Sequence, residues 1–235
     1  MGMERIPPND ISGILLVDKP QDWTSQDVVS CIKHRFHLKK AGHCGTLDPM
    51  ATGLLVLLFG KCTKMQDSLM AKDKVYRASM RLGIETDSED ATGNIIAEHS
   101  IVGIDENAVR EASCSLLGEI RQIPPMVSAI KRNGKKLYEL ARKGVTVERE
   151  ARAISVFSIE IERIALPDVD FLVHCSKGTY VRTLCADWGR ALGCGANMTA
   201  LRRIKSGEHD LSGAYAMETI KGWDLPQFQA ALVEQ

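Results

Sequence analysis

The sequence lacks an excess of charge of either sign, because 30 Lys and Arg residues balance 30 Asp and Glu residues. Net charge therefore argues neither for nor against a nucleic-acid partner. The longest uninterrupted apolar run is Leu54–Phe59, far too short to cross a membrane. The first residues, MGMERIPPND, are polar and broken by proline, unlike a secretory signal. We therefore expect a cytoplasmic protein without a membrane partner.

Recognisable metal and phosphate motifs are also missing. The seven cysteines include no CxxC pair, and no cluster of potential ligands has the spacing of a zinc site. The absence of a GxxxxGK[ST] loop disfavours a phosphoryl-transfer enzyme. We expect reduced thiols, no metal and no cofactor.

The order of the expected elements indicates the fold class. Apolar runs and alternation predict strands at Ile14–Val17, Leu54–Phe59, Val75–Gly83, Ile154–Ile164 and Asp170–Cys175. Helical spacing predicts helices at Ser25–Phe36, with Ser25 as the N-cap, at Glu106–Leu117, at Lys135–Lys143, and from Tyr180 to about Leu192. Strands and helices do not alternate regularly, which favours the α+β class over a doubly wound parallel sheet.

Charge is segregated along the chain. Lys131–Arg152 contains eight basic and three acidic residues, whereas Glu85–Glu106 contains seven acidic residues and no Lys or Arg. One interpretation is an RNA-binding protein that presents a single basic face. The other is two ordinary solvated surface segments.

The stretch Gly42–Gly53, GHCGTLDPMATG, is a glycine-bounded loop that leads directly into the apolar run. A buried strand preceded by such a loop can bring a loop side chain to solvent and substrate. Asp48 stands at its centre, and Pro49 disfavours helical geometry at Asp48. On local pattern alone, an Asp before Pro is most often a turn residue.

The complete loop resembles the active-site motif of the TruB family of bacterial tRNA pseudouridine synthases. The similarity extends to further blocks, in the family's order: GILLVDKPQDWTSQDVV at Gly13–Val29, KVYRASMRLGIETDSEDATG at Lys74–Gly93, SAIKRNGKKLYELARKG at Ser128–Gly144, SKGTYVRTL at Ser176–Leu184 and ALRRIKSG at Ala200–Gly207. Two positions depart from the family pattern. Asp22 stands where relatives usually have glycine, and Val127 replaces a common tyrosine.

The resemblance implies the pseudouridine-synthase fold, with a mixed, mainly antiparallel sheet, flanking helices and a central cleft. It implies one catalytic domain over residues 1–235, with an insertion at about 123–152 that folds over the RNA. About 28 residues follow Gly207. We therefore expect no C-terminal PUA-type domain, because so short a segment is too small for an independent domain.

The resemblance also assigns roles to three residues. Asp48 would be the ionised carboxylate beside the sugar, acting either as a nucleophile at C1′ or as a base at C2′. Arg182 would keep that carboxylate ionised and oriented. Tyr76 would stack on the flipped base and assist removal of a proton from the isomerised product.

Further residues are candidate RNA contacts. His43 would occupy the space left by the flipped nucleotide, and Leu201 would close the pocket around it. Basic candidates for phosphate contacts are Lys19, Lys64, Lys131, Arg132, Lys135, Lys136, Arg202 and Arg203.

These features predict an isomerase that converts a uridine in the T-loop of tRNA, position 55, to pseudouridine. We expect a monomer that acts on the T-arm without a guide RNA. The competing hypothesis is a non-catalytic tRNA-binding or tRNA-folding protein, which would not need a carboxylate facing an anionic ligand.

Overall fold

The computed structural model describes residues 9–126, 131–132, 135–136, 147 and 149–233. The chain divides into two compact units, one formed by Met1–Lys72 with Arg202–Gln235 and the other by Asp73–Leu201. Strand β12 (Ala196–Ser206) belongs to both, since the division falls between Leu201 and Arg202.

The first unit is built on a mixed sheet. Its strands are β1 (Gly13–Lys19), β2 (Ala41–His43), β3 (Thr52–Phe59), the end of β12, β13 (His209–Asp210) and β14 (Tyr215–Ala216). Strands β1 and β3 run antiparallel along their whole length, from Gly13 opposite Phe59 to Lys19 opposite Gly53. Strand β12 is parallel to β3, and β14 is parallel to β1. The sheet order is therefore β14-β1-β3-β12, with β2 also paired to β3.

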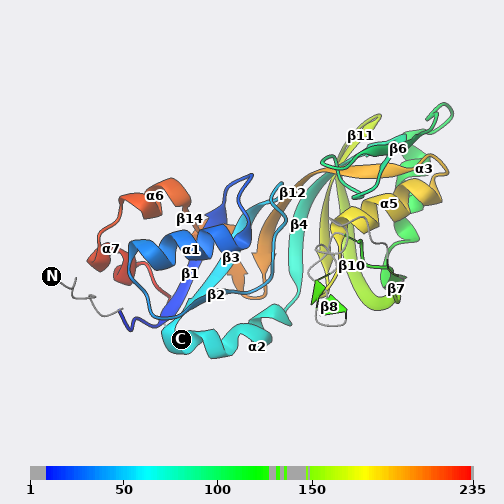
Figure 1. The fold of residues 1–235 in the computed structure, drawn as a ribbon. Helices are drawn as coiled ribbons and strands as arrows, with labels where there is room; N and C mark the ends of the chain where they lie inside the picture. Colours follow the sequence, from blue (N-terminus) through cyan, green and yellow to red (C-terminus); the bar gives the residue numbers. More distant parts are fainter. Residues whose placement is uncertain (1–8, 127–130, 133–134, 137–146, 148, 234–235) are drawn as a thin grey trace. The chain divides into compact units, whose positions relative to one another are not determined.

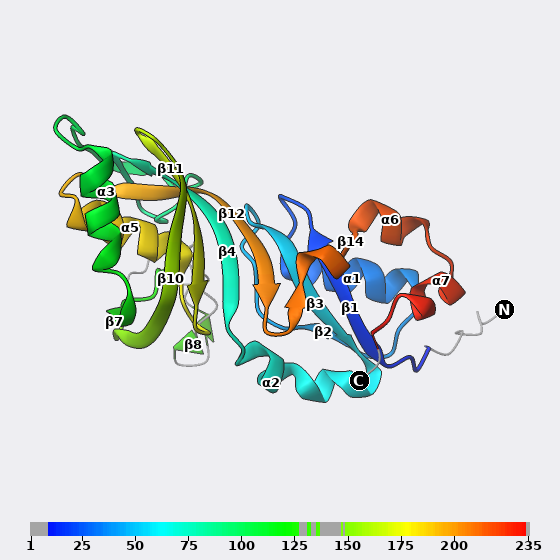
Figure 2. The same cartoon turned by 180° about the vertical axis from the view of Figure 1, so that it is seen from behind.

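Both faces of β1 and β3 are buried, which confirms the strand expected from the apolar run. Helix α1 (Ser25–Arg35) covers one face together with α6 (Met217–Gly222) and α7 (Leu225–Ala230) (Figures 1 and 2). Residues from η1 (Gly60–Met65), α2 (Gln66–Met70) and η2 (Leu211–Gly213) pack on the other face. A strand covered on both faces needs continuous rather than alternating apolar residues.

The expected N-cap of α1 was wrong by one residue. The Thr24 hydroxyl accepts from Asp27 N–H at 3.0 Å, and Asp27 accepts from Thr24 N–H at 2.9 Å, so the two form a capping box. Ser25 lies inside the helix, where its hydroxyl bonds to the backbone of Leu47.

The second unit contains an antiparallel sheet with the order β4-β11-β10-β7. These strands are β4 (Lys74–Leu82), β7 (Gly118–Gln122), β10 (Arg152–Ala165) and β11 (Asp168–Cys175). Burial alternates along β4 and β11, which is typical of a sheet with one covered face. A separate hairpin joins β5 (Ile84–Thr86) to β6 (Ile95–Glu98).

Helices α3 (Glu106–Cys114) and α5 (Val181–Ala191) belong to the same unit and contact each other (Figure 2). Trp188 of α5 is fully buried, lies edge-on to Phe171 of β11, and donates its indole N–H to the Val109 carbonyl at 3.1 Å. The pairing within both units is mixed but mainly antiparallel, which confirms the α+β class.

Most of the expected insertion at about 123–152 lies outside the described residues, including Val127. Strands β8 (Lys131–Arg132) and β9 (Lys135–Lys136) pair antiparallel. The helix expected from Lys135 is thus wrong at its first two residues. These two residues pair with β8, so hydrogen bonding between the strands outweighs the helical spacing there.

Candidate active site

Asp48 lies half-buried in the loop that connects β2 to β3 in the first unit. Its carbonyl accepts from Ala51 N–H at 3.0 Å, which closes a tight turn over Pro49-Met50. Upstream, Cys44 N–H donates to the Val56 carbonyl at 2.9 Å. The loop is therefore held at both ends by backbone hydrogen bonds.

Gly53 ends this loop at a position that only glycine can occupy without displacement. Its φ is +96°, and a Cβ there would lie 2.3 Å from the carbonyl oxygen of Arg203 on β12. The missing side chain permits the parallel pairing of β12 to β3 directly beside the loop.

Lys19 binds backbone carbonyl groups of the Asp48 loop and of the segment before α1. Its side chain is fully buried, and Nζ donates to the carbonyl oxygens of Trp23 at 2.6 Å, Pro20 at 2.8 Å and Pro49 at 3.3 Å. Burial lowers the Lys19 pKa to about 8, opposed by the negative charge of Asp48. Lys19 is therefore buried, with its Nζ on backbone carbonyl oxygens of the protein. This placement does not support the expected contact with an RNA phosphate.

Arg203 requires the same correction. It is 1% exposed, and its guanidinium donates to the Leu54 carbonyl at 2.7 Å and to the Gly45 carbonyl at 3.1 Å. It therefore fastens the Asp48 loop to β3 rather than facing solvent. Arg202 is partly exposed and donates to Asp18 Oδ2 at 2.6 Å.

Two further contacts join the loop to the segment before α1. Ser25 Oγ accepts from Leu47 N–H at 2.9 Å, and Asp22 N–H donates to the Pro49 carbonyl at 2.8 Å. Asp22 has φ +65°, a left-handed conformation that favours glycine. The departure from the family's glycine is therefore accommodated, because Asp is among the residues that tolerate this conformation.

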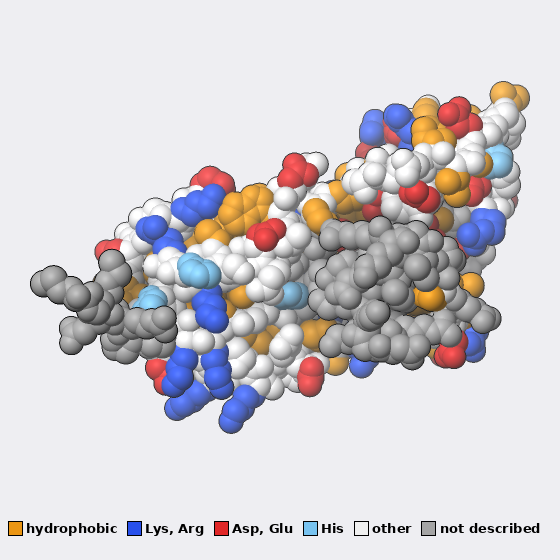
Figure 3. All heavy atoms as spheres, viewed as in Figure 1, with side chains coloured by type: hydrophobic (Ala, Val, Ile, Leu, Met, Phe, Trp, Pro, Cys, Tyr) orange, Lys and Arg blue, Asp and Glu red, His pale blue; other side chains and the backbone are white. Residues whose placement is uncertain are grey.

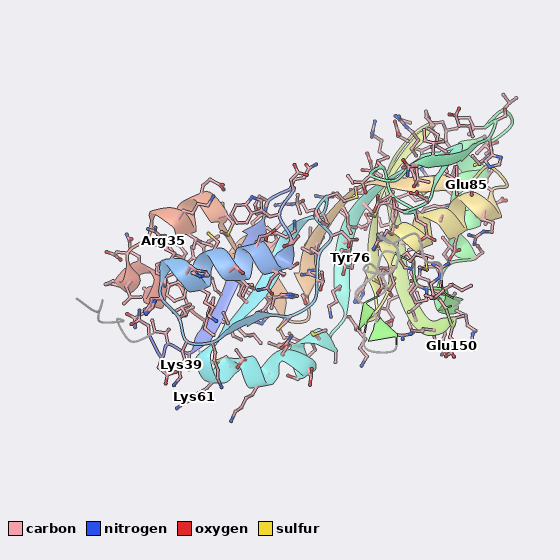
Figure 4. The ribbon with its side chains drawn as sticks, viewed as in Figure 1. Arg35, Lys39, Lys61, Tyr76, Glu85 and Glu150 are labelled. Atoms are coloured by element: carbon pink, nitrogen blue, oxygen red, sulfur yellow. The ribbon has the colours of Figure 1, made fainter. Side chains whose placement is uncertain are left out.

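The other candidates of this unit lie around the same loop. His43 is the half-exposed last residue of β2, and its carbonyl accepts from Gln66 Nε2 at 3.2 Å. Lys64 is exposed in η1. Lys and Arg side chains gather in the lower left of Figure 3, the region where Figure 4 labels Lys39 and Lys61; Arg35 is labelled higher on the same side. These three residues are exposed, and no sequence motif pointed to them.

Tyr76 and Arg182 belong to the second unit. Tyr76 lies on β4, opposite Val173 of β11, and is 9% exposed (Figure 4). Arg182 is in the first turn of α5 and is 3% exposed. Leu201, also 9% exposed, ends the part of β12 assigned to this unit.

Arg182 pairs with Asp90, a residue for which the sequence predicted no role. Nη1 of Arg182 lies 3.4 Å from Oδ2 of Asp90, and both side chains are 4% exposed. Oδ1 of Asp90 accepts from Ser88 Oγ at 2.7 Å and from Thr92 N–H at 2.9 Å. Asp90 lies in the matching block Lys74–Gly93, but only the fold shows which arginine it contacts.

The structure thus assigns the candidates to different units. Asp48, Lys19, His43, Lys64, Arg202 and Arg203 belong to the first, whereas Tyr76, Arg182 and Leu201 belong to the second. For Lys131, Arg132, Lys135 and Lys136 only the strand backbone is described. Among the described residues, no group of three or more His, Cys, Asp or Glu side chains could hold a metal ion. No helix in the described ranges is long and apolar enough to cross a membrane.

Two successive parts of the chain match domains of known protein families. Residues 33–181 match the TruB family pseudouridylate synthase (N terminal domain), and residues 182–228 match the tRNA pseudouridylate synthase B C-terminal domain.

Similar proteins carry corresponding names. The tRNA pseudouridine synthase B of Syntrophotalea carbinolica is 48% identical over 90% of this chain and 69% of its own length. That of Opitutus terrae is 45% identical over 97% of this chain and 94% of its own length.

Among solved structures, a chain from the crystal structure of a Cbf5-Nop10-Gar1 complex superposes with a TM-score of 0.74 at 30% identity. That match covers 94% of this chain and 59% of the other. A structure of an H/ACA RNP bound to a substrate RNA containing 2′-deoxyuridine gives a TM-score of 0.69 at 28% identity, covering 94% and 56%. The fold likeness and the family matches agree with the motif that surrounds Asp48. The chain belongs to the TruB family of pseudouridylate synthases, enzymes that isomerise uridine in RNA to pseudouridine.

Proposed function

We propose that this chain converts uridine 55 in the T-loop of tRNA to pseudouridine, with Asp48 as the catalytic carboxylate. The observation that carries the proposal is the setting of Asp48 in the family loop, half-buried beside the buried cation of Lys19. A nearby positive charge favours the ionised carboxylate that the reaction needs.

The reaction exchanges bonds within one nucleotide. The C1′–N1 bond breaks, the uracil turns, and a C1′–C5 bond forms. The hydrogen on C5 leaves to solvent as a proton, and N1 gains a proton. Atoms and electrons therefore balance without an oxidant or an energy source. Asp48 takes part either by attacking C1′ or by removing a proton at C2′.

Arg182 and Tyr76 complete the proposed catalytic set. Both would act on the same uridine as Asp48. Arg182 would orient the Asp48 carboxylate through charge-assisted hydrogen bonds. Tyr76 would stack on the flipped uracil, which offsets the few kcal/mol that unstacking costs.

Other residues would position the RNA without taking part in the reaction. His43 would fill the space left by the flipped nucleotide, and Leu201 would close the pocket. Lys64 and Arg202 are accessible enough to contact phosphates. The insertion residues Lys131, Arg132, Lys135 and Lys136 would clamp the T-arm through phosphates, which position RNA without reading its sequence.

The proposal includes a cytoplasmic monomer that recognises the T-arm without a guide RNA. Recognition would rest on loop shape and splayed bases, as is general for proteins that read RNA loops. A guide-dependent enzyme would be inactive on a free tRNA transcript, so one assay separates the two possibilities.

The test is tritium release from a [5-³H]uridine-labelled tRNA transcript, with wild type and Asp48→Asn compared and no metal or cofactor added. We expect release by the wild type alone, and none from a transcript with cytidine at position 55. Binding of tRNA by both proteins without any release would instead support the non-catalytic tRNA-binding hypothesis. Release from the cytidine-55 transcript would contradict the assigned position.

A further inference from the structure

The side chain of Gln122 binds the backbone of a residue on a different element. Gln122 is the last residue of β7, is paired with Arg152 of β10, and is 2% exposed. Its Oε1 accepts from the Tyr180 N–H at 2.8 Å, and its Nε2 donates to the Tyr180 carbonyl at 3.1 Å. One buried amide group therefore fixes both polar groups of the Tyr180 backbone.

Tyr180 is the N-cap of α5, so these two bonds hold the start of that helix. In a capping box, a Glu or Gln at the N3 position of the helix itself accepts from the N-cap N–H. The N3 residue of α5 is Thr183, whose hydroxyl instead donates to the Glu89 carboxylate. Gln122 thus supplies from β7 the bond that an N3 side chain supplies in other helices. It also binds the Tyr180 carbonyl, which accepts the first helical hydrogen bond from Leu184 N–H at 3.0 Å.

The tyrosine at the N-cap explains why this bond comes from another strand. Helices are usually capped by Ser, Thr, Asp or Asn, whose short side chains offer no aromatic ring. The Arg182 guanidinium lies over the Tyr180 ring, with 6.0 Å between Cζ and the ring centroid, and it also pairs with Asp90 at 3.4 Å. A cation at this distance from a ring is attracted to it. The orientation of Tyr180 therefore bears on Arg182, and Gln122 fixes that orientation through the backbone.

We propose that Gln122 positions Arg182 for the isomerisation, by fixing the Tyr180 backbone and with it the first turn of α5. Gln122 is a positioning residue, since it acts through Tyr180 and Arg182. This inference rests on the proposed function and adds one residue to the set that the reaction needs. It concerns the rate of the chemical step rather than tRNA affinity. A role in stability alone would change the free energy of unfolding and leave that rate unchanged.

Single-turnover tritium release at saturating enzyme, measured together with tRNA affinity, tests the inference. Gln122→Met keeps the length of the side chain and removes both bonds to Tyr180. We expect release to slow on the order of tenfold while affinity stays within about twofold, because small misplacements of catalytic groups are costly. An unchanged rate would overturn the proposal.

Gln227→Met is the matched control for the loss of such a bond. Gln227 Oε1 accepts from Asp224 N–H at 2.9 Å in the capping box of α7, so the same substitution removes the same kind of bond at the start of a helix in the other unit. It should leave the rate unchanged. A tenfold loss in Gln227→Met as well would show that the effect is not specific to α5 and would overturn the proposal.

Val169→Ala controls for lost stability in the same unit. Val169 is fully buried on β11, opposite Met80 of β4, so its truncation should lower the free energy of unfolding by on the order of 1 kcal/mol. The rate at saturating enzyme should stay at the wild-type value. A rate loss in Val169→Ala as large as that in Gln122→Met would mean that destabilisation slows the reaction, which would contradict a positioning role.

Two further variants separate the geometry of the amide from its presence. Gln122→Asn has its amide on a shorter side chain that no longer reaches both Tyr180 groups, so release should slow as in Gln122→Met. Gln122→Glu is assayed at about pH 5, where burial keeps the introduced carboxyl protonated. A protonated carboxyl has an acceptor oxygen and an O–H donor, as the amide has an acceptor and a donor, so the rate should match that of the wild type at the same pH. A Gln122→Glu rate as low as that of Gln122→Met at this pH would overturn the proposal.

A double-mutant cycle with Arg182→Lys shows whether Gln122 acts through Arg182. Once the guanidinium is gone, its position no longer matters. Gln122→Met should therefore slow the Arg182→Lys variant by less than about twofold, since residues that act through one another do not have additive effects. Multiplication of the two rate losses would show that Gln122 acts elsewhere.

Amide hydrogen exchange gives a readout that does not depend on activity. Exchange at the Tyr180 N–H should be faster in Gln122→Met, which lacks its acceptor, and unchanged in Gln227→Met. Unchanged exchange at Tyr180 in Gln122→Met would refute the structural part of the inference. Absence of tritium release from the wild type would contradict the proposed function itself. Normal release by the wild type with an equal rate in Gln122→Met would overturn this inference alone.

Discussion

The ammonium nitrogen of Lys19 lies 3.3 Å from the carbonyl oxygen of Pro49, the residue that follows Asp48. A buried cation thus contacts the backbone of the Asp48 loop and also attracts the Asp48 carboxylate. This arrangement couples the loop's geometry to the protonation state of one lysine.

Lys19 should therefore impose a pH dependence on the reaction. With its pKa near 8, Lys19 is mostly protonated at pH 7 and loses its charge as the pH rises through 8. We expect the single-turnover rate to fall on this alkaline side. Lys19→Met should slow the reaction on the order of 10²-fold at pH 7 and lack that decline. Persistence of the same decline in Lys19→Met would contradict this assignment.

The free energy of unfolding should rise with pH over the range in which the reaction rate falls. The folded-state pKa of Lys19 is below its ordinary value of 10.5, so folding favours the neutral amine. The stabilisation is present above pH 10.5 and is lost as the pH falls towards 8. Urea unfolding between pH 7 and 10 should show this increase in the wild type and not in Lys19→Met.

Gly53→Ala should destabilise the protein by more than about 1 kcal/mol, because it combines positive φ with a Cβ 2.3 Å from the Arg203 carbonyl. Gly222→Ala is the matched control, since no atom lies within 4 Å of its added Cβ and its φ is not positive. In α6 that change should be neutral or stabilising by up to about 1 kcal/mol. Equal urea midpoints for the two variants would show that the close approach of β12 is not required.

Arg182→Lys should lower the rate on the order of 10²-fold with little effect on tRNA affinity, because a point charge does not reproduce the planar fork. Arg77→Lys makes the same change in a mainly exposed ion pair with Glu162 at 2.9 Å. An exposed pair of this kind contributes about 0–1 kcal/mol to stability. Arg77→Lys should change neither the reaction rate nor the tRNA affinity. A near-wild-type rate for Arg182→Lys would remove Arg182 from the catalytic set.

Tyr76→Phe keeps the aromatic ring and removes the hydroxyl. We expect tRNA binding to be retained while tritium release slows on the order of 10²-fold, the scale of lost acid–base assistance. Tyr76→Leu should also weaken binding of the flipped nucleotide, since it removes the stacking surface. If Tyr76→Phe releases tritium at the wild-type rate, Tyr76 contributes stacking alone.

Thiol reactivity provides a check on the fold that is independent of catalysis. Burial raises the pKa of Cys175 to about 11 and also raises that of Cys185, so both should react slowly at pH 8. Cys114 is exposed and should give the fastest phase with a thiol reagent. Cys114→Ser should abolish that phase, and a fast reaction at Cys185 would contradict the described packing of α5.

Local sequence patterns predicted the elements well where one physical preference dominated. The apolar run forms β3, which is covered on both faces, and such a strand needs continuous apolar residues. Patterns failed where two local preferences competed. Thr24 rather than Ser25 caps α1, because Thr24 stands three residues before Asp27 and completes the capping box.

Charge was the property that the sequence predicted least well. Lys19 and Arg203 looked like phosphate contacts, yet both are buried with their nitrogens on backbone carbonyls. Neither spacing nor composition reveals whether a cation meets solvent or the protein interior. That outcome depends on which carbonyl groups the folded chain leaves without other donors.

The sequence by itself determined the family and the fold class, because both depend on residue types at fixed local spacing, and it predicted Asp48 as the catalytic carboxylate. Only the tertiary structure decided that Lys19 binds the backbone of the Asp48 loop and that Asp90 pairs with Arg182. Residues 90 and 182 are far apart in the chain. Their contact arises from the packing of a hairpin segment against a helix, which no local pattern encodes.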